Sequence, residues 1–237
     1  MTEQPEVRAA LEEVADIGPF FAVSANPAEV VDDSWRPWRD FYERPEPMAE
    51  RVRLVAGALG IEASRAADLR IAGSIAQQGL AARLVSPVLA VASVHRRVPE
   101  WSPDTLHWRP AVSGVLPMWE SAERFSDADA GLEALVTGHL EPLAAITREV
   151  SGASPRTLRG NAASALAAAG RLVARARPEA AAAALGEVAE LLRAGPLAGA
   201  GALAPSWAFR RRSCCLYYKV PGGGVCGDCV LGAGQRS

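Results

Sequence analysis

The chain has 237 residues, 49% of them apolar, and a formal net charge of −2. This composition can form the core of one large domain, or of one domain with an appendage. The weak charge gives no reason to expect nucleic acid or an anionic membrane as a partner. Residues 1–18 lack the features of a signal peptide, and no long uncharged apolar run predicts a membrane span. We therefore expect a cytoplasmic protein.

The first half of the chain has the spacing of helices. Apolar residues predict a helix over 2–17, a second over 48–59 that stops at Gly60, and a longer helical region after Ser64. Within that region, Ser86-Pro87 is expected to mark a break, because proline disfavours a helical conformation at the preceding residue.

The chain changes character between Thr105 and Trp119, where turn residues, aromatics and valines predict two short strands. Helix resumes near Ser126, which resembles the start of a capping box with Asp129. Pro142 is expected to kink or divide this helix.

Ser154 and Pro155 then open another helix in the favoured order of cap and proline, and a last helix runs from Pro178 to Gly195. We predict an α+β fold that is mainly helical, with residues 1–195 as a helical body. Residues 196–206 are interpreted as a linker and 207–237 as a small C-terminal segment packed on that body.

All four cysteines lie in the C-terminal segment, at Cys214, Cys215, Cys226 and Cys229. A reducing cytosol favours a metal site over two disulfides. Structural zinc fits the Cys-x2-Cys half but not the adjacent pair. A [2Fe–2S] cluster also takes four thiolates, and its two irons offer separate attachment points for neighbouring cysteines. A dithiol redox pair is the third possibility, although the usual βαβ context is missing.

The residues around the cysteines are compatible with a chain that wraps a metal. Pro221 and the three glycines that follow allow a tight reversal with positive φ, which returns the second cysteine pair to the first. Arg210, Arg211 and Arg212 precede the cysteines. They would favour the negative charge of a cluster or attract an anionic substrate, or they form a solvated basic turn.

Other motifs are weak. The glycine-rich stretches at 199–204 and 222–227 match a dinucleotide fingerprint in spelling, but neither sits between a strand and a helix in a βαβ unit. His95, His107 and His139 are far apart in the sequence and are interpreted as structural residues. No nucleophile elbow or carboxylate pair supports hydrolytic chemistry.

The spacing Cys-Cys-x10-Cys-x2-Cys, written CCLYYKVPGGGVCGDC, resembles the C-terminus of the ferric siderophore (ferric hydroxamate) reductase family. The preceding RRS and the following VL are similar to that family as well. LRGNAASAL at 158–166 is a weaker match, because Arg159 stands where the family commonly has tryptophan. The resemblance implies a cytoplasmic iron–sulfur protein whose [2Fe–2S] cluster is bound by Cys214, Cys215, Cys226 and Cys229.

The resemblance also implies one-electron reduction of siderophore-bound Fe(III) to Fe(II), with a hydroxamate-type ferric siderophore held on the helical body. Because no nucleotide or flavin fingerprint is evident, a separate donor such as a ferredoxin or a flavoprotein reductase is expected. Its predicted contact runs from Arg210 to Lys219. The alternatives are a zinc-stapled binding protein without redox activity, and an iron–sulfur electron carrier or sensor.

Overall fold

The computed structural model describes residues 3–29, 33–111 and 114–234. Helices make up most of it, which confirms the predicted α+β fold that is mainly helical. The α-helices are α1 (Gln4–Ala15), α2 (Asp40–Glu43), α3 (Pro45–Ala58), α4 (Ala66–His95), α5 (Ala128–Leu135), α6 (Glu141–Ser151), α7 (Pro155–Ala176) and α8 (Ala181–Arg193). The strands are β1 (Arg36–Pro37), β2 (Arg97–Pro99), β3 (Leu106–Trp108), β4 (Met118–Glu120), β5 (Phe125–Asp127), β6 (Gly201–Leu203) and β7 (Phe209–Arg211).

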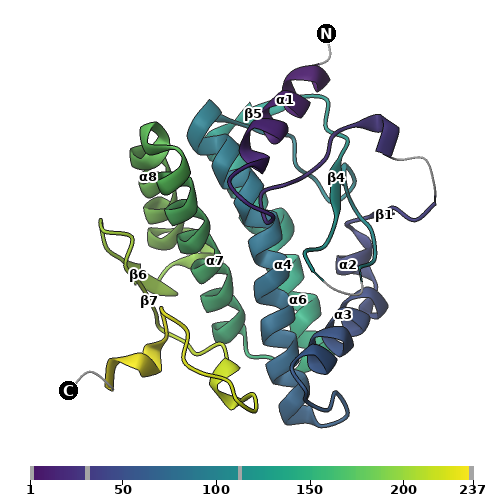
Figure 1. Cartoon of the computed structure of the whole chain (residues 1–237), viewed down its shortest axis with the longest axis vertical. Helices are drawn as coiled ribbons and strands as arrows, with labels where there is room; N and C mark the ends of the chain where they lie inside the picture. The colour runs from purple at the N-terminus through teal and green to yellow at the C-terminus, as the bar shows by residue number, and fades with distance from the viewer. Residues whose placement is uncertain (1–2, 30–32, 112–113, 235–237) are drawn as a thin grey trace.

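The long helix α4 forms the centre of the molecule, with α7 and α8 on one side and α3 and α6 on another (Figure 1). Almost every residue from Leu80 to Ser93 is buried. By length and composition α4 could cross a membrane, but 78% of its most apolar window is buried inside the protein. Its contacts with the neighbouring helices are sufficient to account for its apolar composition.

The predicted break at Ser86-Pro87 is wrong, because α4 continues through Pro87 to His95. Proline in a helix interior removes one hydrogen bond and costs about 3 kcal/mol in an isolated helix. Here both residues are buried in the middle of the core. The packing of α4 against its neighbours therefore offsets the local preference of the sequence for a break.

Several helix ends follow the sequence as predicted. Gly60 adopts φ +65° after α3, and Ser154 caps α7 by accepting a hydrogen bond from the amide of Thr157. Pro142 lies in the first turn of α6, and a π-helical turn over Val136–Leu140 joins α5 to α6. The helix expected from Ser126 onward thus changes from α to π geometry over Val136–Leu140, just before Pro142, and remains helical on both sides.

The predicted capping residue of α5 is wrong by one position. Asp127, not Ser126, accepts the hydrogen bond from the amide of Ala130. Ser126 belongs to β5, and its hydroxyl donates to the carbonyl of Val98 in the paired strand β2. The strand pairing decides which residue is free to cap the helix.

The predicted strand pair between Thr105 and Trp119 is confirmed as β3 and β4, which pair antiparallel with Leu106 opposite Glu120. β1 adds to the outer side of β3, so the sheet order is β1-β3-β4. The pairs β2–β5 and β6–β7 were not predicted. Each of these strands has three residues, which is too short for an alternating pattern to show.

The expected linker over 196–206 is ordered. Gly195–Leu197 forms a helical turn, and β6 pairs antiparallel with β7, with Ala202 opposite Arg210. This hairpin and the cysteine-containing residues after it lie beside α7, at the end of the colour scale in Figure 1. The division of the chain into body, linker and tail remains a prediction, but residues on both sides of 206 pair with each other.

Candidate metal centre

Gly160 in α7 lets the C-terminal segment approach the helix closely. A Cβ added at this position would lie 2.0 Å from Ser213 Oγ and 3.3 Å from Arg211 Nη2. Such a distance from Ser213 is shorter than any van der Waals contact allows. The absent side chain of Gly160 is therefore a packing requirement, and it brings the residue before Cys214 onto the surface of α7.

A buried chain of hydrogen bonds joins the cysteine segment to α4 and α7. The Arg211 guanidinium donates to Oδ1 of Asn161, and Asn161 Nδ2 donates to the carbonyl oxygen and Oγ of Ser74, at 2.8 and 3.0 Å. Ser74 Oγ in turn donates to the carbonyl of Cys215 at 2.8 Å. These bonds fix the main chain at Cys215 relative to the two long helices α4 and α7. Asn161, which links them, belongs to the segment LRGNAASAL at 158–166.

The three consecutive arginines have different surroundings. Arg210 and Arg212 are exposed, whereas Arg211 is only 1% exposed. The sequence suggested one basic patch. Successive residues of a strand point to opposite faces, so an expected strand at β7 would have predicted that Arg210 and Arg211 face different surroundings.

Arg211 also lacks a counter-charge within the part of the chain that the structure describes. Its Nε and Nη1 atoms are buried without a hydrogen-bond partner, and no carboxylate forms an ion pair with it. A buried charge without a partner is strongly unfavourable. A four-thiolate [2Fe–2S] centre is formally dianionic when oxidised, so its charge suits this environment.

The four thiols are arranged as two pairs. The Sγ atoms of Cys215 and Cys226 are 4.0 Å apart. The thiol of Cys229 lies close enough to Cys214 to contribute to the raised pKa of Cys214. Each pair takes one member from the adjacent cysteines and one from the Cys-x2-Cys half. The two neighbouring cysteines therefore have different partners, as a two-iron cluster allows.

Backbone amides point at two of the sulfurs. The amide of Leu216 donates to Cys214 Sγ at 3.3 Å, and the amide of Leu231 donates to Cys229 Sγ at 3.4 Å. Leu216 adopts φ +72°, which turns the chain immediately after the cysteine pair. Hydrogen bonds from amides to thiolate sulfur stabilise negative charge and tune the reduction potential of iron–sulfur clusters.

The predicted reversal at Pro221 is confirmed. Gly222 adopts φ +71°, and the amide of Gly223 donates to the carbonyl of Val220 at 2.8 Å, which closes a tight turn. A residue with positive φ after proline is the signature of a type II turn. The turn returns Cys226 to the neighbourhood of Cys215.

Burial favours the protonated form of two of the thiols, those of Cys214 and Cys226, when no metal is bound. It raises the pKa of Cys214, and the neighbouring thiols of Cys215 and Cys229 raise it further. Burial likewise raises the pKa of Cys226, with an additional contribution from the nearby Asp228. A bound cation removes this penalty, because it replaces the thiol protons and compensates the thiolate charges.

The arrangement of the donors distinguishes the possible metals. A single tetrahedral zinc ion needs four convergent ligands. Among the described residues, no three Cys, His, Asp or Glu side chains converge closely enough to hold one ion. Two irons need two protein sulfurs each, and two pairs of cysteines are what the chain presents. The donor set therefore fits a [2Fe–2S] cluster better than zinc.

The histidines lie away from the cysteines in the fold. His139 is fully buried in the π-helical turn, where its ring nitrogens contact the Tyr42 hydroxyl at 3.0 Å and the Trp101 carbonyl at 3.3 Å. Burial lowers its pKa to about 4. His95 contacts Glu13, and His107 contacts the carbonyl of Thr105, the residue just before its strand β3. All three make contacts expected of structural residues.

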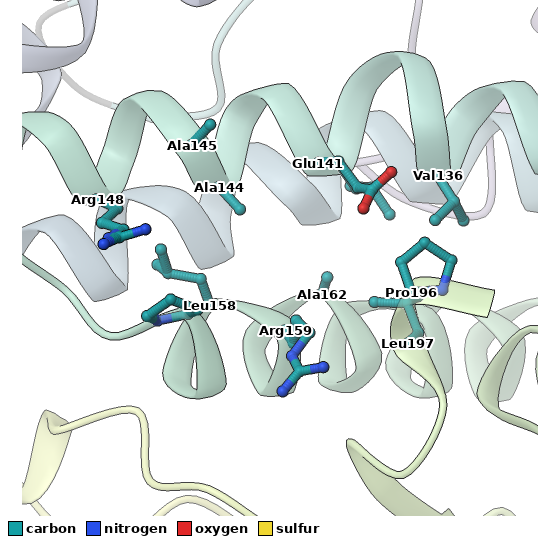
Figure 2. Close-up of a pocket in the computed structure, with 12 residues that line it drawn as sticks. Val136, Glu141, Ala144, Ala145, Arg148, Leu158, Arg159, Ala162, Pro196 and Leu197 are labelled. Carbon is teal, nitrogen blue, oxygen red and sulfur yellow. The ribbon is translucent and has the colours of Figure 1, made fainter.

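Two cavities flank α7 on different faces. One, of about 280 Å³, lies between α6 and α7 and is lined by Glu141, Arg148, Leu158 and Arg159 among others (Figure 2). The other, of about 390 Å³, lies between α7 and the C-terminal segment. Arg159, in the segment LRGNAASAL, thus borders the cavity that does not include the cysteine loop.

The Lys219 side chain extends from a helical turn over Tyr217–Lys219 and is exposed, near the ring of Tyr218. Arg210 is exposed as well, but it donates a hydrogen bond to the carbonyl of Cys229 at 3.3 Å. The structure therefore places three of the four predicted basic residues on the surface around the cysteines, and buries the fourth, Arg211.

Comparison with known proteins identifies the C-terminal segment. No curated protein matches the chain. Residues 211–231, which include all four cysteines, match the model of the FhuF 2Fe-2S C-terminal domain. This protein therefore carries an FhuF-like C-terminal [2Fe–2S] domain, as the resemblance to the ferric siderophore reductase family implied.

Proposed function

We propose that Cys214, Cys215, Cys226 and Cys229 are the four ligands of the [2Fe–2S] cluster. We further propose that Cys214 and Cys229 bind one iron and that Cys215 and Cys226 bind the other, which the 4.0 Å separation of the Cys215 and Cys226 sulfurs supports. This division explains how adjacent cysteines serve one cluster without both bending toward a single ion.

Four single Cys→Ser variants test the ligand set. Each is expected to lose the cluster or to change its absorption and EPR spectra, because serine is a harder and more basic ligand than cysteine. In Mössbauer spectra of variants that retain iron, C214S and C229S should perturb one iron site, and C215S and C226S the other. A variant with wild-type spectra and iron content would exclude that residue as a ligand. Colourless protein that contains zinc would support the zinc-stapled alternative instead.

We further propose that the protein is a cytoplasmic ferric-siderophore reductase. The observation that carries this proposal is the FhuF-like [2Fe–2S] domain packed against a large helical body, with a polar cavity at its ligand loop. A [2Fe–2S] cluster supplies one electron at a time, and reduction of chelated Fe(III) to Fe(II) consumes one. Siderophore oxygen donors hold Fe(II) weakly, so the electron releases the iron. A plain electron carrier has no need of so large a body.

The electron must come from a separate protein in this scheme. The glycine-rich stretch at 199–204 is part of the β6–β7 hairpin, and the stretch at 222–227 is the turn that precedes Cys229. Neither joins a strand to a helix, as a dinucleotide site requires. A ferredoxin or a flavoprotein reductase therefore remains the proposed donor.

Stopped-flow mixing tests the reductase activity. Dithionite-reduced protein mixed with ferric siderophores should lose the reduced-cluster signal while Fe(II) appears in a ferrous trap in equal amount. NADH or NADPH alone should give no steady turnover, and an added donor protein should restore it. No reoxidation by any chelate, with a cluster potential above those of the chelates, would support a carrier or sensor instead.

A further inference from the structure

The cavity between α7 and the C-terminal segment has a polar lining and a volume of about 390 Å³. One wall comes from α7, with Ser164, Ala167, Ala168 and Arg171 at the spacing of one helix face. The opposite wall comes from β7 and its flanks, and from Gly227 and Asp228. It is therefore built where the helical body and the iron–sulfur domain meet.

This cavity borders the proposed ligand loop directly. Gly227 and Asp228 are the two residues between Cys226 and Cys229, and Arg210 donates to the carbonyl of Cys229. A molecule in the cavity would therefore contact the loop that holds two of the cluster ligands. The cavity in Figure 2 and the one between α5 and α8 include no residue of the cysteine loop. Electron transfer weakens steeply with distance, so this cavity is the best placed for an electron acceptor.

The lining is positively charged. Arg171 and Arg210 are exposed, and neither forms an ion pair with another described residue. Asp228 is the one acidic residue of the lining, and it accepts a hydrogen bond from Ser164. The guanidinium of Arg171, and the donors of Arg210 other than the Nη1 that bonds to Cys229, are therefore available to a ligand. Guanidinium binds carboxylate with two parallel hydrogen bonds.

The surrounding sequence enhances this charge. Residues 155–176 and 195–237 together hold nine basic residues and one acidic residue, whereas the whole chain is nearly neutral. Positive potential over a concave site attracts anions and repels cations. Three hydroxamates neutralise the charge of Fe(III), so a simple trihydroxamate chelate has an uncharged centre. A chelate with carboxylate or catecholate donors carries excess negative charge.

We propose that this cavity is the chelate site of the reductase, and that Arg171 and Arg210 select anionic ferric chelates over neutral trihydroxamates. The inference rests on the proposed function and adds to it a binding site and a substrate charge. The family resemblance implies a hydroxamate siderophore, and the arginines require a negatively charged one. An iron chelate that combines hydroxamate groups with citrate carboxylates meets both requirements.

Gallium complexes separate binding from reduction, because Ga(III) has the coordination chemistry of Fe(III) but accepts no electron under these conditions. Calorimetry should measure the affinities of the cluster-containing protein for two gallium complexes, one of an anionic citrate-based dihydroxamate and one of a neutral cyclic trihydroxamate. The anionic complex is expected to bind at least about tenfold more tightly, since one charge-assisted contact is worth about that factor. R171Q and R210Q should each weaken it by roughly tenfold and leave the neutral complex almost unchanged.

R148Q is the matched control, because Arg148 lines the cavity on the other face of α7. Its affinities should equal those of the wild type. Arg210 donates a hydrogen bond to the carbonyl of Cys229, whereas no hydrogen bond joins Arg171 to the cysteine loop among the described residues. The result for R171Q therefore holds even if R210Q loses its cluster. Equal wild-type affinity for both complexes, or weakening by R148Q but not by R171Q, would overturn the inference and leave the reductase function intact. A wild type that binds neither complex and reduces no ferric chelate would contradict both.

Discussion

Arg211 places a buried positive charge beside the cysteine segment. Its amide donates to the carbonyl of Asp228 at 3.0 Å, one residue before Cys229, and its guanidinium reaches Asn161. Reduction adds a negative charge to the cluster. A nearby cation therefore stabilises the reduced state more than the oxidised one, and the low polarity around a buried guanidinium strengthens the effect.

R211Q is expected to lower the midpoint potential of the cluster, because it removes that charge but keeps a side chain that can bond to Asn161. An EPR-monitored redox titration measures the shift. R212Q provides the control, since Arg212 is exposed and solvent screens its charge. Equal shifts in the two variants would show that the buried position of Arg211 has no electrostatic role.

At the scale of elements, α7 determines where the iron–sulfur domain sits. Gly160 meets Ser213, and Gly170 meets the ring of Trp207, with an added Cβ 2.5 Å from the nearest ring atom. Both glycines lie inside the helix, where glycine is otherwise unfavourable by roughly 0.5–1 kcal/mol relative to alanine. Close packing of the C-terminal segment explains why the helix contains them.

G160A should destabilise the protein by about 1–3 kcal/mol and reduce the iron content, because the new Cβ overlaps Ser213 Oγ. S213A should rescue G160A, since it removes the overlapping atom. Urea unfolding and iron analysis measure both effects. G186A, in open space on α8, is the control and should be neutral or slightly stabilising. A double variant as unstable as G160A alone would show that the helix itself, not the contact, is affected.

Strand β4 contains a buried carboxyl group, that of Glu120, whose ionisation makes the free energy of unfolding depend on pH. Burial raises the pKa of Glu120 from 4.5 to about 8. The unfolded chain therefore ionises this group at lower pH than the folded protein. The contribution of Glu120 to the free energy of unfolding is therefore fully present below pH 4.5, and it is lost as the pH rises to about 8.

Wild-type protein should accordingly lose unfolding free energy across this range, by on the order of 5 kcal/mol at full ionisation of Glu120. E120Q keeps the shape of the side chain but cannot ionise. Urea unfolding between pH 6 and pH 9 should show a decline in the wild type that is much smaller in E120Q. If stability declines equally with pH in the wild type and in E120Q, ionisation of Glu120 is not the cause of the decline.

At the scale of the whole molecule, charge is unevenly distributed. With nine basic residues and one acidic residue in α7 and the C-terminal region, the remainder of the chain has a net charge of −10. Exposed apolar side chains also gather near the cysteines, at Tyr217, Tyr218, Val225, Val230 and Leu231. A positive surface with exposed aromatic and aliphatic groups suits an acidic protein partner.

An acidic ferredoxin should therefore reduce the cluster at a rate that falls as salt is added, because ions screen the attraction between the two surfaces. Stopped-flow absorption at increasing NaCl concentration measures this dependence. K219Q should lower the rate at low salt and reduce the salt dependence. A rate independent of salt would exclude electrostatic steering by this surface. Reduction by dithionite in wild-type and K219Q proteins should be alike, which controls for damage to the cluster.

Local patterns in the sequence account for much of the fold and for the cluster itself. Helix ends at Gly60 and Ser154, the strand pair around Thr105–Trp119 and the turn at Pro221 follow from residue preferences that act over a few positions. The cysteine spacing is likewise local: by itself it left a cluster, zinc and a dithiol pair possible, and its resemblance to a known family pointed to the cluster.

Tertiary structure decided what depends on residues far apart in the chain. The core around α4 keeps the helix intact at Pro87, and pairing with β2 moves the helix cap to Asp127. Arg211 is buried because β7 turns it toward Asn161, 50 positions earlier, while Arg210 faces the cavity with Arg171. Local preference cannot encode such positions, because their energies come from contacts formed only when distant segments pack together. The sequence by itself thus determined which cofactor the protein carries, and the fold decided which charges surround it.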